Sequence, residues 1–191
     1  MNRFCTFVAT AASTAVLATG LAAGGADAEP ATSVKDQLVG SWSLVSLVAD
    51  QGGKKVEPAG PNPIGRMILD ADGRFATIVL RPGLPRFASG NRMQGTPDEH
   101  KAIVQGSNAF FGTYTISEAD RSIVFRVEFG TFPNWNGDEQ KRIFTLSGDE
   151  LSYVSPTTTV GGGTAHVVWK RVPPIIQDQY VCIGADCYGR Y

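Results

Sequence analysis

The stretch Ile64–Leu80, IGRMILDADGRFATIVL, decides the fold class. Its two halves have the pattern of β-strands and flank Asp70-Ala71-Asp72-Gly73-Arg74, in which Asp and Gly supply the backbone conformations that a tight turn needs. The stretch therefore predicts a β-hairpin with strands at Ile64–Leu69 and Phe75–Leu80.

Strand-like segments continue on both sides of this hairpin, at Trp42–Ala49, Phe110–Ile116, Arg121–Phe129, Lys141–Leu146, Leu151–Val154 and Thr164–Arg171. One helix is expected between the third and fourth strands, because Thr96 can cap it, Pro97 fits its first position and acidic residues follow. Gly83–Thr96 is a long loop. About eight strands joined mainly by short turns predict an all-β fold, either an antiparallel up-and-down barrel or a highly curved sheet.

Composition narrows the function classes. The 191 residues include 17 Lys and Arg against 18 Asp and Glu, which gives no basic arm for nucleic acid and no acidic tail. With 42% hydrophobic residues and 22 Gly, the chain has material for one core and many turns, which argues against disorder, coiled coils and helical bundles.

The first 28 residues read as a secretory signal peptide. Arg3 precedes an apolar stretch that runs to Ala23, and Ala26-Asp27-Ala28 has the pattern of a cleavage site. A retained membrane anchor is the alternative, although the stretch is mostly Ala, Thr and Gly. We therefore expect a periplasmic or secreted protein with no membrane span after cleavage, a barrel domain at residues 29–172 and a tail at 173–191.

The tail contains Cys182 and Cys187. In an oxidising compartment the pair is expected to close a small disulfide loop, and the spacing differs from the Cys-x-x-Cys of redox proteins. Metal or redox chemistry is the less favoured alternative, because no histidine lies nearby in the sequence.

Short motifs resemble those of one family. Gly40-Ser41-Trp42 is similar to the G-x-W signature of lipocalins, and six segments follow the order seen in the bacterial and fungal lipocalin-like domain family: Leu38-Val39-Gly40-Ser41-Trp42, Asn62-Pro63-Ile64-Gly65, Asp72-Gly73-Arg74-Phe75, Phe111-Gly112-Thr113-Tyr114, Phe132-Pro133-Asn134-Trp135 and Gly148-Asp149-Glu150-Leu151. The resemblance covers about Ser33 to Arg171 and implies a calycin-type barrel with a central cavity. It also implies that Arg171 crosses Trp42 and closes one end.

Gln140, Arg142, Phe144 and Leu146 share one strand face, polar at one end and apolar along the rest. Such a face suits an amphiphile, with Arg142 pairing with a carboxylate or sulfonate and Phe144 contacting an apolar tail. The alternatives are that Arg142 pairs with an acid such as Glu128 on a neighbouring strand, or that it points to solvent.

Strand alternation suggests further cavity residues. Leu44, Ser46 and Val48 share the face of Trp42. Phe129 shares the face of Ile123, Phe125 and Val127, and Phe110 and Gly112 share the face of Tyr114. Alternation alone does not say which of these faces point inward. Trp135 is expected either to cover the barrel mouth or to pack on the outer wall. His166 would enter the cavity only if its face were internal. The candidate ligand-binding residues are Gln140, Arg142, Phe144, Tyr114, Phe125, Trp135 and His166.

These features favour a protein that binds a small hydrophobic or amphiphilic molecule in the barrel. Two other classes stay open: an isomerase or cyclase that uses Tyr114, Glu128, Arg142 or His166 for proton transfer, and a filled barrel that acts through its surface as an inhibitor or scaffold. We expect no metal and no cofactor, since His100 and His166 are the only histidines, and there is no G-x-S-x-G motif of hydrolases.

Overall fold

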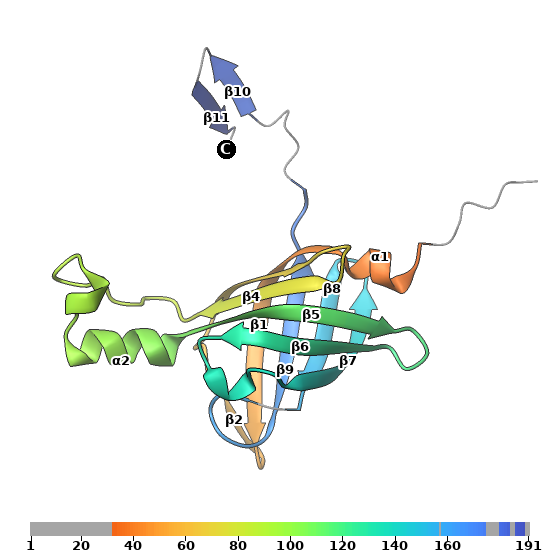
Figure 1. The fold of residues 1–191 in the computed structure, drawn as a ribbon, viewed down its shortest axis with the longest axis horizontal. Coiled ribbons are helices and arrows are strands. Elements are labelled where there is room, and N and C mark those ends of the chain that lie inside the picture. The colour runs from red at the N-terminus through yellow and green to blue at the C-terminus, as the bar shows by residue number, and fades with distance from the viewer. Residues whose placement is uncertain (1–31, 157, 175–179, 184–185, 190–191) are drawn as a thin grey trace, which may run out of the picture. The chain divides into compact units, whose positions relative to one another are not determined.

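The computed structural model describes residues 32–156, 158–174, 180–183 and 186–189 (Figure 1). The expected signal peptide lies outside these described residues.

Eight antiparallel strands close into a barrel, which confirms the predicted architecture and excludes the open sheet. Every strand pairs with the next one along the barrel, and β1 also pairs with β9, so the sheet returns to its first strand. The barrel strands are β1 (Gly40–Gln51), β3 (Ile64–Leu69), β4 (Arg74–Leu80), β5 (Ser107–Ser117), β6 (Ser122–Gly130), β7 (Glu139–Ser147), β8 (Glu150–Ser155) and β9 (Thr164–Arg171).

The other elements are short. β2 (Lys54–Val56) extends only the far end of β1, and α1 (Val34–Leu38) precedes the barrel. α2 (Pro97–Gly106) follows β4 and precedes β5, and Thr96 and Glu99 form a capping box at its start. Residues 32–156 also contain two single turns of 3₁₀ helix, η1 (Arg92–Gln94) and η2 (Pro133–Trp135).

β10 (Tyr180–Ile183) and β11 (Asp186–Gly189) form a separate hairpin in the tail. The backbones of Cys182 and Cys187 are paired directly across it. Their side chains lie outside the described part of the chain, so the disulfide stays a prediction.

Two β-bulges change which residues point inward. In β1 the register shifts between Leu44 and Ser46, so the inner positions after Leu44 are Leu47 and Ala49. The expectation that Ser46 and Val48 share the inner face of Trp42 is therefore wrong. A second shift, between Phe111 and Gly112, turns Phe129 outward and leaves it 63% exposed.

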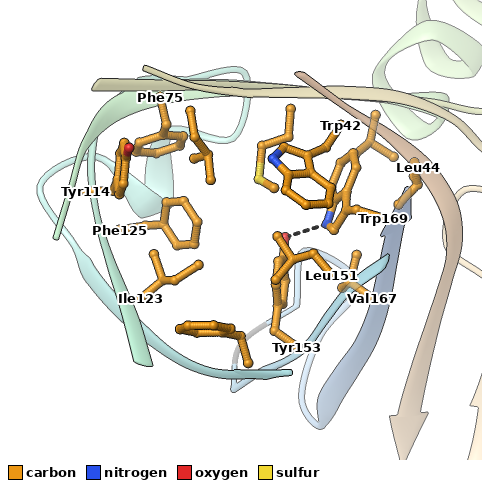
Figure 2. Close-up of a cluster of buried hydrophobic side chains, with 14 of the residues drawn as sticks. Trp42, Leu44, Phe75, Tyr114, Ile123, Phe125, Leu151, Tyr153, Val167 and Trp169 are labelled. Carbon is orange, nitrogen blue, oxygen red and sulfur yellow. Dashed lines mark hydrogen bonds between the residues drawn. The ribbon is translucent and has the colours of Figure 1, made fainter. Parts of the chain in front are cut away.

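One end of the barrel is filled by side chains. We call it the closed end; it is where β1 begins and β9 ends (Figure 2). Figure 2 shows the side chains of Trp42, Phe75, Ile123, Phe125 and Leu151 gathered inside the barrel wall. The rings of Phe75 and Phe125 meet edge to face with their centres 4.8 Å apart, a packing that stabilises beyond simple burial.

Arg171 seals this closed end. Its guanidinium lies 4.2 Å from the centre of the Trp42 ring and donates hydrogen bonds to the carbonyl oxygens of Val39, at 3.0 Å, and Gln37. An ion pair to Asp149 at 3.4 Å completes its contacts. Gly40 lies beside it with a φ of +131°, and a β-carbon there would be 3.2 Å from Arg171 Nη1, so both the conformation and the space favour glycine.

Candidate ligand-binding site

A cavity of about 70 Å³, here called the chamber, lies inside the barrel beyond the closed-end core. Its walls are mainly apolar, from Leu47, Val79, Phe110, Trp135, Ala165, Val167 and Trp169. Polar side chains enter it from Thr77, Arg142, Tyr153 and Ser155. A mainly apolar pocket with a few convergent polar groups is the usual form of a small-molecule site.

A larger hollow of about 560 Å³, here called the vestibule, adjoins the chamber. The two share Pro58, Asn108 and Thr159 in their linings. Polar residues are frequent in the vestibule, where Arg81 donates a hydrogen bond to the carbonyl oxygen of Pro58 at 3.0 Å. The end of the barrel that holds the chamber and the vestibule is called the open end below. A molecule that entered here would meet polar groups first and apolar walls further in.

Arg142 is the charged residue of the chamber. β7 alternates without interruption from Gln140 to Phe144, which places Gln140, Arg142 and Phe144 inside, as the face pattern requires. Arg142 is only 4% exposed. Its Nη2 donates to Gln140 Oε1 at 2.6 Å and its Nη1 to the Tyr153 hydroxyl at 2.9 Å. The backbone of β7 thus presents a charged fork to the cavity.

The guanidinium rests on aromatic rings rather than on a carboxylate. Its central carbon lies 4.7 Å from the ring centre of Phe125 and 4.9 Å from that of Tyr153. Within the described residues, no salt bridge reaches Arg142. Glu128 lies exposed in the bulged part of β6, so neither the expected acid partner nor the solvent-facing alternative holds.

Tyr153 links the guanidinium of Arg142 to the indole of Trp169 through hydrogen bonds. Its hydroxyl oxygen accepts a second hydrogen bond from Trp169 Nε1 at 3.0 Å, drawn as the dashed line in Figure 2. The alternation of Leu151, Tyr153 and Ser155 along β8 puts all three inside the barrel. Sequence reasoning missed Tyr153 and Trp169 as site residues. The alternating apolar pattern of Leu151 and Tyr153 was the available signal.

Trp135 covers part of the chamber. The Pro133–Trp135 turn places its indole edge to face with Phe110, with ring centres 5.4 Å apart, and with Phe132, at 5.5 Å. Trp135 lines the chamber and Phe132 lines the vestibule. Of the two expected positions of Trp135, the one over the barrel interior is therefore the one that the structure shows.

The other three candidate residues, Tyr114, Phe125 and Phe144, lie in the hydrophobic core next to the chamber. Phe125 and Phe144 are buried, and the Phe144 ring carries the guanidinium of Arg121 at 5.4 Å. The Tyr114 hydroxyl donates to the carbonyl oxygen of Asp70 at 2.6 Å, inside the closed end. Burial, and after it the charge of Asp70, raises the pKa of the Tyr114 phenol. These residues support the chamber rather than line it.

His166 is not a chamber residue. Ala165, Val167 and Trp169 take the inner positions of β9, so alternation turns His166 to the exposed outer face. The condition on which its cavity role depended is not met. Among the described residues that line the chamber, none is a histidine, an aspartate or a glutamate.

Metal-binding clusters and membrane-spanning helices are both missing from the described residues. No set of three or more His, Cys, Asp and Glu side chains is placed to hold a metal ion in this part of the chain. No helix found there has the length and apolar character that crossing a bilayer requires.

Comparisons with known proteins give the family of the chain. The chain is 29% identical over 104 residues to the 4'-hydroxy-3'-methoxypropiophenone carrier protein ppsC of Aspergillus oryzae (strain ATCC 42149 / RIB 40), a match that spans 50% of this chain and 94% of that protein. Among solved structures, a mutant of the fluorescent protein UnaG is 10% identical and matches over 71% of this chain and 96% of its own, with a TM-score of 0.34. A family model described as a lipocalin-like domain matches residues 39–172. That match covers more than half of the sequence, and the chain belongs to the lipocalin-like domain family.

Proposed function

We propose that this protein is an extracytoplasmic carrier of a small amphiphilic molecule, which it holds in the chamber. The observation that supports this most strongly is Arg142, a buried cation without a carboxylate partner in the described part of the chain, set into an otherwise largely apolar cavity. Burying a charge is costly unless something compensates it. A bound molecule with a polar end supplies that compensation.

The size of the chamber sets the kind of molecule. Its volume of about 70 Å³ is small, and the vestibule of about 560 Å³ lies directly outside it. A compact polar head fits against Arg142, while the rest of the molecule extends past Trp135 toward the vestibule. At about 25 cal/mol per Å² of buried apolar area, a few ring-sized contacts provide several kcal/mol.

The name of the Aspergillus oryzae relative supports an aromatic ligand. 4'-Hydroxy-3'-methoxypropiophenone denotes a single ring with oxygen substituents and a short ketone side chain. Phe110, Trp135 and Trp169 offer aromatic surface to such a ring. We therefore propose small oxygenated aromatic compounds as the ligand class.

The competing functions have less support. The isomerase or cyclase alternative named four groups, of which Arg142 alone lines the chamber, while Glu128 and His166 are on the outer surface. The filled-barrel alternative fits the exposed row of Ile68, Phe111 and Phe129 on the outer wall. It does not fit the chamber itself.

The proposed location rests on the N-terminal sequence alone. Expression of the full chain in a bacterium, fractionation and mass measurement of the product test it. We expect a periplasmic or secreted protein that begins at Glu29. An uncleaved protein in the membrane fraction would favour the anchor instead.

The carrier function is tested by titrating the purified protein with 4'-hydroxy-3'-methoxypropiophenone and following tryptophan fluorescence. We expect saturable quenching, because Trp135 and Trp169 line the chamber. Arg142→Met should weaken binding about tenfold or more, or about 1.4 kcal/mol. The matched control is Arg126→Met, which removes an exposed arginine that pairs with Glu139 on the surface. No saturable signal, or equal loss in both variants, would count against the proposal.

A further inference from the structure

We call Gln140, Arg142 and Tyr153 the donor cluster, because the acceptor oxygens of Gln140 and Tyr153 are already occupied and Arg142 has donors alone. Trp169 Nε1 and Arg142 Nη1 both donate to the Tyr153 oxygen, because neither an indole nor a guanidinium can accept. The phenol oxygen has thus accepted twice. Its own proton is what it has left to offer to a further partner.

The other two members also have donors to spare. Gln140 Oε1 is taken by Arg142 Nη2, and Gln140 Nε2 and Arg142 Nε are buried without a hydrogen-bond partner. A buried polar group left without a partner destabilises the state in which it is buried. The cluster therefore has unused donors on all three side chains, whereas the amide oxygen is already engaged.

The donor cluster also carries a positive charge that no neighbouring group among the described residues balances. Arg142 contacts Phe125, Gln140 and Tyr153, none of which is a carboxylate. The ring faces of Phe125 and Tyr153 attract the cation, but they supply no formal negative charge. Within the described residues, no carboxylate lies within 4.0 Å of the guanidinium.

Resting on the proposed carrier function, we infer that the chamber selects ligands by ionisation state and binds an anionic oxygen, a carboxylate or a phenolate, against the donor cluster. Arg142 and Tyr153 are the members of the donor cluster that line the chamber, so an anion there can accept the proton of the Tyr153 hydroxyl and balance the buried charge at once. A neutral amide or alcohol head brings donors of its own that the cluster cannot satisfy. An ammonium head is repelled.

A matched series of small ligands tests this selection. Benzoate, benzamide and benzylamine share one ring and differ in the charge and donors of the head. We expect wild-type protein and the Arg126→Met control to bind benzoate at least about tenfold more tightly than benzamide, a difference of about 1.4 kcal/mol, and to show no saturable binding of benzylamine. In Arg142→Met the preference for benzoate should disappear, and Arg142→Lys should restore part of it.

The outcomes separate the two proposals. Equal affinity for benzoate and benzamide in wild-type protein, or tighter binding of benzamide, overturns the ionisation-state inference and leaves the carrier function intact. Failure of all three ligands and of 4'-hydroxy-3'-methoxypropiophenone to bind overturns both. Circular dichroism shows whether each variant folds, and the comparison of the neutral and charged heads in wild-type protein needs no variant at all.

4-Nitrophenol gives a second, direct readout, because its phenolate is yellow and its phenol is nearly colourless. At a pH near its ionisation midpoint, wild-type protein should increase the yellow absorbance in proportion to the ligand bound. Arg126→Met should behave alike, and Arg142→Met should give no increase. Saturable binding with unchanged or reduced phenolate absorbance would overturn the inference.

Discussion

Two arginines at opposite ends of the barrel both lie on aromatic rings, yet their surroundings differ. Arg171 covers Trp42 at the closed end and finds two carbonyl oxygens and the carboxylate of Asp149. Arg142 rests on two rings at the chamber, keeps a buried nitrogen without a partner and has no carboxylate among the described residues. A satisfied cation contributes to the fold, whereas an unsatisfied one is available to a ligand.

The largest effect is expected from removing the ring beneath Arg171. Trp42 is fully buried, and its indole donates to the carbonyl oxygen of Leu38 at 2.9 Å. Trp42→Ala should lower the free energy of unfolding by about 3–5 kcal/mol, because it opens a large cavity in the closed end. Urea denaturation measures the change. A loss below about 1 kcal/mol would mean that the closed end does not support the barrel.

Arg171→Met should cost less, roughly 1–3 kcal/mol of unfolding free energy. The variant gives up the contact with the Trp42 ring and leaves the carbonyl oxygens of Gln37 and Val39 without their donor. The same urea titration measures it. A neutral result would contradict the structural part assigned to this arginine.

Arg142→Met should change the free energy of unfolding less than either of these two variants. The substitution replaces a buried charge without a carboxylate partner by an apolar side chain of similar length, a change that is often neutral or stabilising. Gln140 Oε1 loses its donor, which offsets part of this gain, so we expect an unfolding free energy within about 1 kcal/mol of that of the ligand-free wild type. A loss as large as that of Arg171→Met would remove the distinction between the two ends.

A small pH effect is expected from the surface. Asp120 accepts from Lys141 Nζ at 2.5 Å, and this bond, followed by those of Ser117 and Ser122, holds the Asp120 pKa well below its ordinary value. A carboxyl with a lowered folded-state pKa stabilises the protein above its unfolded pKa of about 3.9, and loses that contribution as the pH falls through the folded value. Asp120→Asn should therefore be slightly less stable than wild type at pH about 7, with a difference that shrinks in strong acid. Urea titrations at several pH values test this, and a pH-independent difference would contradict it.

Much of the barrel could be predicted from the sequence, because alternation along regular strands fixes the face of each residue. The unbroken alternation of β7 predicts that Gln140, Arg142 and Phe144 share one face, and the structure shows that this face points inward. The bulges broke the same reasoning for Ser46 and Phe129, since one extra residue reverses every later side chain.

Gly112 is a sequence signal of one bulge, although strand alternation takes no account of it. A β-carbon at Gly112 would lie 2.0 Å from the carbonyl oxygen of Arg126, so glycine is required where the two strands approach. Glycine inside a strand is a known sign of such irregularity. The aromatic partners of Arg142 were harder to predict, because they come from β6 and β8 and depend on the register of the closed barrel.

The three indole groups of the chain report on both ends of the barrel at once. A nitrogen–proton correlation spectrum recorded during titration with benzoate tests the central claim most directly. The account predicts that the resonances of Trp135 and Trp169 shift with a common saturation curve while that of Trp42 stays in place. Saturable binding that moves Trp42 and leaves Trp135 and Trp169 unchanged would contradict it.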